Sequence, residues 1–115
     1  MPHPDEALGL MIGSPRWQAP TLLNSWVNYG AGYTDAGFYR MPNGFVRLRG
    51  LLKLGVINTP MFTLPVGCRP ATVQVVATIV NGALCYVEIR ANGDVVPTNG
   101  VNNYVAIDNI TFQAA

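Results

Sequence analysis

Ionised side chains are scarce in this sequence. Only 11% of its 115 residues are charged, whereas about a quarter of residues are charged in an ordinary soluble domain. The net charge is +1, and the six arginines and the single lysine are scattered, with only Arg47 and Arg49 close together on one strand face. Binding of a polyanion by release of counterions requires a concentrated basic patch. The sequence therefore predicts no nucleic-acid partner.

Histidine and cysteine are also rare. His3 is the only histidine, and Cys68 and Cys85 are the only cysteines. Their spacing does not match paired metal ligands, and no histidine accompanies a candidate nucleophile. We predict no metal site, no other cofactor and no catalytic triad. The two cysteines are expected to be reduced thiols, with a disulfide between them as the alternative.

Long hydrophobic runs are absent. The longest, Val75 to Val80, is far too short to span a bilayer, so no membrane insertion is expected. The N-terminus shows neither the basic region nor the apolar stretch of a signal peptide. We expect a protein that acts where it is made or leaves the cell inside a larger particle.

Apolar residues are plentiful and make up 50% of the chain, enough for one domain with a real core. Because so few charges cover the surface of a chain of this size, part of that surface is predicted to contact another subunit or protein. Residues 1–20 hold four of the nine prolines and no period, which predicts an extended arm or a disordered tail. Residues 21–115 are predicted to form the folded domain.

Strand signals fill that domain. Phe45 to Leu54 alternates with a period of two, and Gly50 within it indicates a bulge or a close backbone approach. Asn81-Gly82 between two strand-like runs is a strong hairpin signal. The predicted strands are Trp26–Tyr29, Phe38–Met41, Phe45–Leu54, Met61–Leu64, Thr72–Val80, Ala83–Arg90, Asp94–Val96, Tyr104–Ile107 and Ile110–Phe112.

This pattern predicts an all-β fold, an antiparallel β-sandwich or jelly-roll-like domain with an extended N-terminal arm. Pro65, Gly67 and Pro70 predict a sharp corner, of the kind found where a chain crosses between two packed sheets. Asn92-Gly93 is expected to turn the chain again and to extend the hairpin into a meander.

The acidic residues are better explained by turns than by catalysis. Glycoside hydrolysis needs two convergent carboxylates. Glu88 and Asp94 flank one predicted hairpin, but Asp94 follows Asn-Gly and Asp108 precedes Asn109, both of which are turn contexts. We therefore predict that the protein is not an enzyme. A polysaccharide-degrading enzyme built on Glu88, Asp94 and Asp35 is the weaker alternative.

Two predicted loops are rich in the residues of recognition surfaces. Tyrosine supplies a large contact area at low entropic cost, and asparagine supplies adaptable hydrogen bonds. Turn formation alone also explains much of the asparagine and glycine. The candidate contact residues are Tyr29, Tyr33 and Tyr39 around the first loop, and Asn99, Asn102, Asn103 and Tyr104 in the second.

Several segments, in this order and spacing, resemble the C-terminal tip domain of tailed-bacteriophage tail fibres and minor tail proteins. The resemblance covers roughly Trp17 to Phe112, and its most specific part is the strand-Gly step followed by Leu-Pro-x-Gly-x-Arg-Pro. The segments that carry it are Trp26, Tyr39-Arg40, Asn43–Gly50, Phe62–Pro70, Val87–Val95 and Ile107–Phe112.

The resemblance implies a β-sandwich head that forms homotrimers on the fibre axis and touches the host surface, usually a glycan. The implied location is the tail tip or fibre of the virion, after synthesis in the host cytoplasm. Its implied partners are other virion tail proteins and a host cell-surface carbohydrate. Such domains normally end a longer chain, whereas this sequence starts with only a short arm, so an excised tip and a small stand-alone virion protein are both compatible with it.

The alternative from the structural class is a decoration or collar protein that clamps neighbouring virion subunits without binding a receptor. For the trimer, three side chains on the less obviously core-facing sides of their strands are the candidate interface residues. They are Phe45, Leu51 and Val76.

Overall fold

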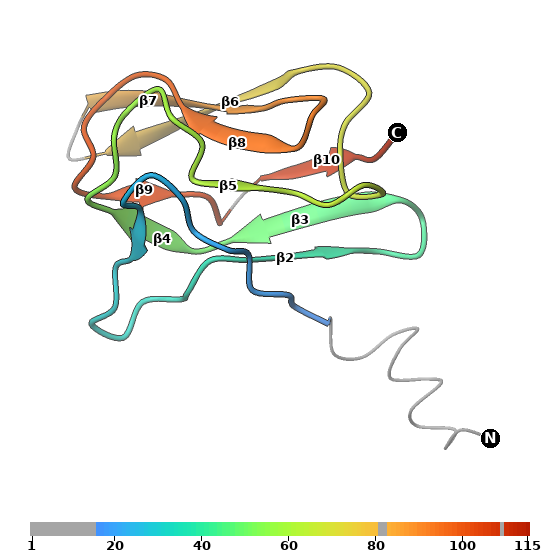
Figure 1. Ribbon diagram of the computed structural model, residues 1–115, viewed down its shortest axis with the longest axis horizontal. Coiled ribbons are helices and arrows are strands. Elements are labelled where there is room, and N and C mark those ends of the chain that lie inside the picture. The colour runs from blue at the N-terminus through green and yellow to red at the C-terminus, as the bar shows by residue number, and fades with distance from the viewer. Residues whose placement is uncertain (1–15, 81–82, 109) are drawn as a thin grey trace.

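The computed structural model describes residues 16–80, 83–108 and 110–115, and these contain ten strands and no helix (Figure 1). The strands are β1 (Val27–Asn28), β2 (Gly37–Arg40), β3 (Phe45–Arg49), β4 (Leu51–Lys53), β5 (Phe62–Thr63), β6 (Gln74–Val80), β7 (Ala83–Ile89), β8 (Asp94–Pro97), β9 (Val105–Ala106) and β10 (Thr111–Gln113).

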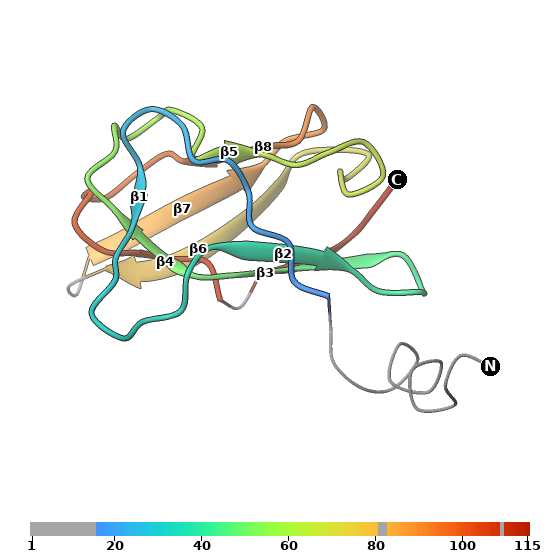
Figure 2. The same cartoon turned by 60° about the horizontal axis from the view of Figure 1, so that its bottom comes forward.

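The strands form three antiparallel sheets. One has the order β5-β8-β7-β6, the second β10-β3-β2 and the third β1-β4-β9. Figure 1 shows the four-stranded sheet above β2, β3 and β10, with β4 and β9 at one end, and Figure 2 shows the same layers from another side. The predicted all-β, antiparallel β-sandwich is confirmed.

The space between the layers is filled by apolar side chains only. In the described residues no polar or charged residue is buried, and the core includes Trp26, Leu48, Phe62, Val87 and Ile107. Inward and outward residues alternate along β3 and β7, as expected for strands with one face on the core and one face outward. This burial supplies most of the stabilisation of the fold.

The predicted strand Phe45–Leu54 is in fact two strands that belong to different sheets. Gly50 separates β3 from β4, with a φ of +127° that only glycine adopts readily. The predicted close approach at Gly50 is confirmed, but the alternation does not continue beyond it. Leu51 and Leu52 are both buried, and Leu54 is exposed.

This break corrects one candidate interface residue, because Leu51 is buried within the protomer. Val76 also lies on the inner side of its strand, where it pairs with the buried Val87 and packs against the core. Phe45 is exposed. Of the three candidates, only Phe45 therefore presents its side chain to the outside.

The corner between β5 and β6 has the predicted local geometry but a different role. Gly67 has a positive φ, and the Cys68 N–H donates to the Pro65 carbonyl oxygen at 3.0 Å. However, β5 and β6 are the two edges of one sheet, so the chain passes around β7 and β8 and does not cross to another sheet. The connection that does this is long and covers residues 64–73.

The hairpins follow the expected pairing. β6 and β7 pair over their whole length, from Gln74–Ile89 to Val80–Ala83, while the predicted turn Asn81-Gly82 lies outside the described residues. The Asn92-Gly93 turn between β7 and β8 is confirmed by the Gly93 N–H, which donates to the Arg90 carbonyl oxygen at 2.8 Å.

Most of the predicted arm, residues 1–15, lies outside the described residues. Gln18 already pairs with Phe38 through both backbone groups, at 2.8 and 3.0 Å. Contact with the sheet therefore begins before Thr21, where the sequence predicted the domain to start.

Candidate functional site

Three tyrosines from two loops lie together at one end of the molecule. The β1–β2 loop supplies Tyr29 and Tyr33, and the β8–β9 loop supplies Tyr104. The ring centroids are 5.2 Å apart for Tyr29 and Tyr33, 5.5 Å for Tyr29 and Tyr104, and 6.1 Å for Tyr33 and Tyr104. All three pairs are edge-to-face, the geometry that aromatic quadrupoles favour. We call these residues the tyrosine cluster.

Backbone contacts fix the β1–β2 loop. The Tyr29 N–H donates to the Leu51 carbonyl oxygen at 2.8 Å, and the Tyr33 N–H donates to the Gly30 carbonyl oxygen at 3.0 Å. Asn28 Oδ1 accepts the Ala36 N–H at 2.8 Å and so closes the loop at its far end. The tyrosines thus project from a loop that is tied to β4 and to itself.

The β8–β9 loop is held against the segment that follows β4. The Leu54 N–H donates to the Asn102 carbonyl oxygen at 2.8 Å, and Asn102 Nδ2 donates to the Gly55 carbonyl oxygen at 2.7 Å. Because β4 pairs with both β1 and β9, it brings Tyr29 and Tyr104 to the same place.

One cation accompanies the rings. Lys53 Nζ lies 4.7 Å from the Tyr29 ring centroid, within the range of a cation–π interaction. The sequence analysis did not select Lys53. Its position on a strand next to the β1–β2 loop becomes visible only from the pairing of Val27 with Lys53.

Tyr104 keeps its hydroxyl proton to a higher pH than an ordinary tyrosine, because its pKa is raised. Burial raises the pKa of Tyr104, and the neighbouring Tyr33, Tyr29 and Asp108 raise this pKa further. Tyr33 is 50% exposed, so its ring is accessible from outside. The cluster therefore offers exposed aromatic surface, neutral hydroxyl groups and one ammonium group.

The other predicted contact residues lie elsewhere or hold the loops in place. Tyr39 packs edge-to-face on Trp17 at 4.5 Å, and the Arg49 guanidinium lies 4.3 Å from the Trp17 ring. Asn99 Nδ2 donates to the Leu84 carbonyl oxygen at 3.4 Å, and Asn103 is exposed in the β8–β9 loop. Of the seven candidates, Tyr29, Tyr33 and Tyr104 lie together in the tyrosine cluster.

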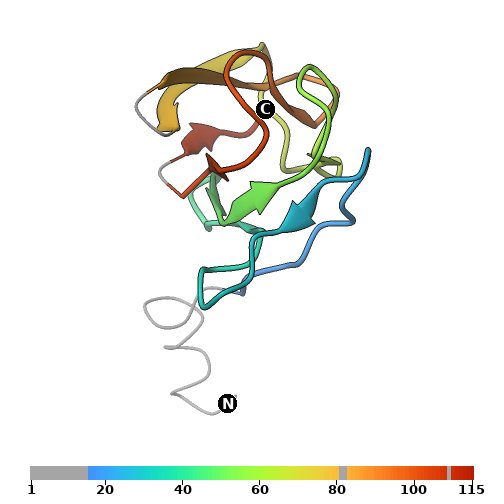
Figure 3. The ribbon, with the colours of Figure 1, turned by 90° about the vertical axis from the view of Figure 1, so that its left-hand side faces the viewer.

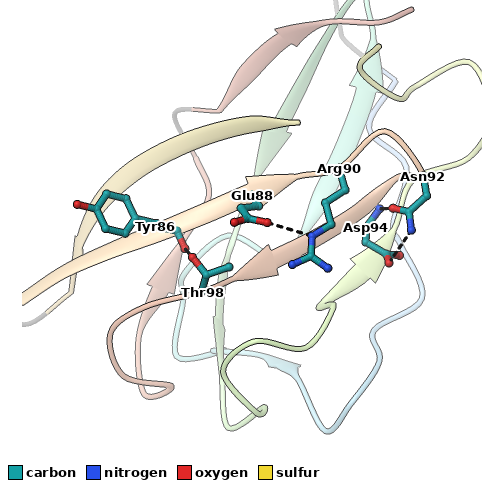
Figure 4. Close-up of polar contacts among 6 residues, drawn as sticks. All are labelled: Tyr86, Glu88, Arg90, Asn92, Asp94 and Thr98. Atoms are coloured by element: carbon teal, nitrogen blue, oxygen red, sulfur yellow. Dashed lines mark hydrogen bonds and ion pairs between the residues drawn. The ribbon is translucent and has the colours of Figure 1, made fainter. Parts of the chain in front are cut away.

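Two of the three carboxylates considered for catalysis, those of Glu88 and Asp94, are engaged with local partners (Figure 4). Arg90 Nε lies 3.0 Å from Glu88 Oε1. Asp94 Oδ1 accepts the Thr63 hydroxyl at 2.7 Å, and Asn92 Oδ1 accepts the Asp94 N–H at 3.0 Å. The turn role predicted for Asp94 is confirmed.

No cluster of three or more potential metal ligands occurs in the part of the chain that the structure describes. Among residues 16–80, 83–108 and 110–115 there is also no helix with the length and apolarity needed to cross a membrane. Cys68 and Cys85 are free thiols, and both are buried.

No protein-family model matches this sequence, and no curated protein is significantly similar to it. Among solved structures, the fold is similar to that of the receptor binding protein gp15 of Listeria phage PSA. The match has a TM-score of 0.72 and covers 98% of this chain and 72% of that chain, at 14% sequence identity. At this identity the similarity establishes a shared fold.

Proposed function

We propose that this protein is the receptor-binding head of a bacteriophage tail. The proposal is supported by the similarity of its fold, over nearly the whole chain, to a phage receptor binding protein. The resemblance to tail-tip domains in the sequence points the same way. The protein then belongs to the tail tip or fibre of the virion, is made in the host cytoplasm, and attaches to other tail proteins.

The receptor in this proposal is a host cell-surface carbohydrate bound at the tyrosine cluster. The observation that carries it is the convergence of two loops, distant in the sequence, on three tyrosines that contact one another. Aromatic rings present flat apolar surface with a polar end, which suits the apolar faces and hydroxyl groups of a sugar.

Binding without chemical conversion is part of the proposal. Glu88 is paired with Arg90, and Asp94 is engaged by Thr63 and Asn92, so these two carboxylates have structural roles. We further propose that the head is a homotrimer. Three shallow sites on one particle raise avidity through effective concentration without any new contact.

The test is binding of the purified protein to an array of bacterial surface glycans and to a panel of bacterial cell envelopes. We expect binding by the wild-type protein and about a tenfold or greater weakening per site in Tyr33→Ala, because a half-exposed ring is removed. Tyr33→Phe keeps the ring and should retain most of the binding.

Val66→Ala is the control, because it removes exposed apolar surface that belongs neither to the tyrosine cluster nor to the candidate interface residues. Equal weakening by Val66→Ala and Tyr33→Ala would contradict the assigned site. Absence of binding to every envelope, together with binding to capsid or collar components, would replace the receptor role with that of a virion decoration or collar protein.

A further inference from the structure

The outer face of the β6–β7 hairpin is largely apolar although it is exposed. On β6 and the residue before it, the apolar residues of this face are Val73, Val75 and Ala77, and on β7 they are Leu84 and Tyr86, which are followed by one charged residue, Glu88, opposite Val75. The exposed fractions of the four large apolar side chains are 51% for Val73, 59% for Val75, 46% for Leu84 and 38% for Tyr86. We call the five apolar residues the hairpin face.

The orientation of this face follows from the register. Ala77 is directly opposite Tyr86, and Val76 is directly opposite Val87. Because Val87 is fully buried, Val76 and Val87 point inward and the Ala77–Tyr86 pair points outward. The outward residues of the hairpin that the structure describes are therefore apolar except for Glu88, which is directly opposite Val75.

The strand at the margin of this sheet also lacks the usual protection of an edge. β6 ends the order β5-β8-β7-β6, and in the described residues no strand other than β7 is hydrogen-bonded to it. Its sequence, Gln-Val-Val-Ala-Thr-Ile-Val, contains neither lysine nor proline, the residues that commonly prevent association at an edge strand. Both observations indicate that this side of the sheet is covered in the assembled protein.

The charges next to the face indicate what covers it. The ionised residue opposite Val75, Glu88, forms an ion pair with Arg90 at 3.0 Å, so the two charges balance and this side of the hairpin has no net charge of either sign. Such a surface does not select an oppositely charged partner, but copies of one neutral, largely apolar face can meet around a common symmetry axis. The low charge of the whole chain agrees with a contact between copies.

The location of the face fits the same occupant. Figures 1 and 3 show the β6–β7 hairpin and the β1–β2 loop, which carries Tyr29 and Tyr33, on opposite sides of the molecule. Copies that pack on the hairpin face therefore leave this loop free. A receptor and the neighbouring subunits would not compete for the same surface.

We propose that the hairpin face is the surface through which copies of this chain associate, with Val75, Ala77 and Leu84 at its centre. The inference rests on the homotrimer of the proposed function and adds the residues that form the contact. It replaces Leu51 and Val76, which face the core, with their outward neighbours on the hairpin.

The first experiment measures the mass in solution by light scattering for the wild type, Val75→Glu and Val66→Glu. A carboxylate in a closed apolar contact has no partner, so Val75→Glu should raise the subunit dissociation constant about a hundredfold or more. We expect three times 12.4 kDa for the wild type and a single 12.4 kDa chain for the variant.

Val66→Glu is the matched control, because Val66 is 84% exposed in the loop before β6 and is not part of the hairpin face. It should keep the wild-type mass. Circular dichroism and a thermal melt establish that Val75→Glu is folded, as expected for a substitution at an exposed position. A folded Val75→Glu that keeps the wild-type mass, or a monomeric wild type, would overturn the inference.

A second measurement does not depend on dissociation. Because Cys68 and Cys85 are buried, a short bismaleimide should join chains only through a thiol introduced at the surface. Ala77→Cys should yield cross-linked chains on a denaturing gel, and Val66→Cys should not. Cross-linking of both variants to the same extent would contradict an interface at the hairpin face.

These results are separable from the receptor role. Dissociation of Val75→Glu in a protein that binds no envelope would support the contact and refute receptor binding. A wild-type trimer that binds envelopes, together with an undissociated Val75→Glu, would support receptor binding and refute this contact.

Discussion

Gly50 lies directly against the backbone of Ala36. A Cβ atom at residue 50 would come within 2.5 Å of Ala36 Cα and within 2.8 Å of the Ala36 nitrogen. On the other side, Gly50 is fixed by hydrogen bonds to residues 107 and 108. The point at which the chain leaves one sheet for another is therefore closely packed, and the β1–β2 loop depends on it.

Gly50→Ala should destabilise the protein severely. The methyl group would overlap backbone atoms that cannot move independently, and the φ of +127° is unfavourable for alanine. Together these effects should cost roughly 3–5 kcal/mol of unfolding free energy. Gly67→Ala is the matched control, because Gly67 has a φ of +97° with no atom within 4 Å of the added carbon, so only about 1–2 kcal/mol is expected. Urea unfolding of both variants provides the comparison, and equal losses would contradict the packing argument.

Asp108 stabilises the same position through a hydrogen bond. Its Oδ1 accepts the Gly50 N–H at 2.7 Å. Asp108→Ala should leave this partly buried donor unpaired and cost about 1–3 kcal/mol of unfolding free energy. Asp108→Asn keeps an oxygen acceptor and should cost less. If thermal melts show the same midpoint for Asp108→Ala and the wild type, the hydrogen bond makes no net contribution.

The sequence predicted the hairpins and most strand positions because their signals are local. Asn92-Gly93 specifies a turn by itself, and the alternation in Phe45–Arg49 specifies its inner face. The consequence of Gly50 could not be predicted in the same way. Whether a mid-strand glycine makes a bulge or a change of sheet depends on Ala36 and Asp108, which are distant in the sequence.

The tyrosine cluster shows the same limit. Tyr29, Tyr33 and Tyr104 were each selected from loop composition, but their proximity depends on β4 pairing with β1 on one side and β9 on the other. Lys53 was missed because a lysine in an alternating strand normally indicates only an outward face. Tyr39 and Asn99 were selected by the same compositional signal, and the structure gives them packing and loop-holding roles.

The two cysteines should react slowly with thiol reagents while the protein is folded. Burial raises the pKa of Cys68, an effect that the nearby Arg40 charge partly opposes, and burial also raises the pKa of Cys85. Thiolate is the reactive form, so alkylation by iodoacetamide at about pH 8 should be about tenfold or more slower than in urea. Measuring alkylation of the Cys68→Ser and Cys85→Ser variants gives the alkylation rate of each thiol separately. Fast alkylation of either thiol in the folded protein would contradict its burial.

Because of Tyr104, the free energy of unfolding should decrease as the pH rises into the alkaline range. Burial raises the pKa of the folded Tyr104 above its ordinary value of about 10, with Tyr33 adding to the effect. The unfolded chain therefore loses this proton first as the pH rises. The stabilisation of the folded state that comes from the raised pKa of Tyr104 is fully present below about pH 10. It is lost as the pH rises from there through the pKa of Tyr104 in the folded protein.

The difference in tyrosinate absorbance between the wild type and Tyr104→Phe should therefore show a midpoint above pH 10. Urea unfolding should show the wild type losing stability relative to Tyr104→Phe above this pH, because phenylalanine has no proton to release. Tyr39→Phe is the control, because Tyr39 lies in the separate contact with Trp17. A Tyr104 midpoint at or below the ordinary value would show that the hydroxyl is solvated, and the tyrosine cluster would then be more open than its ring contacts indicate.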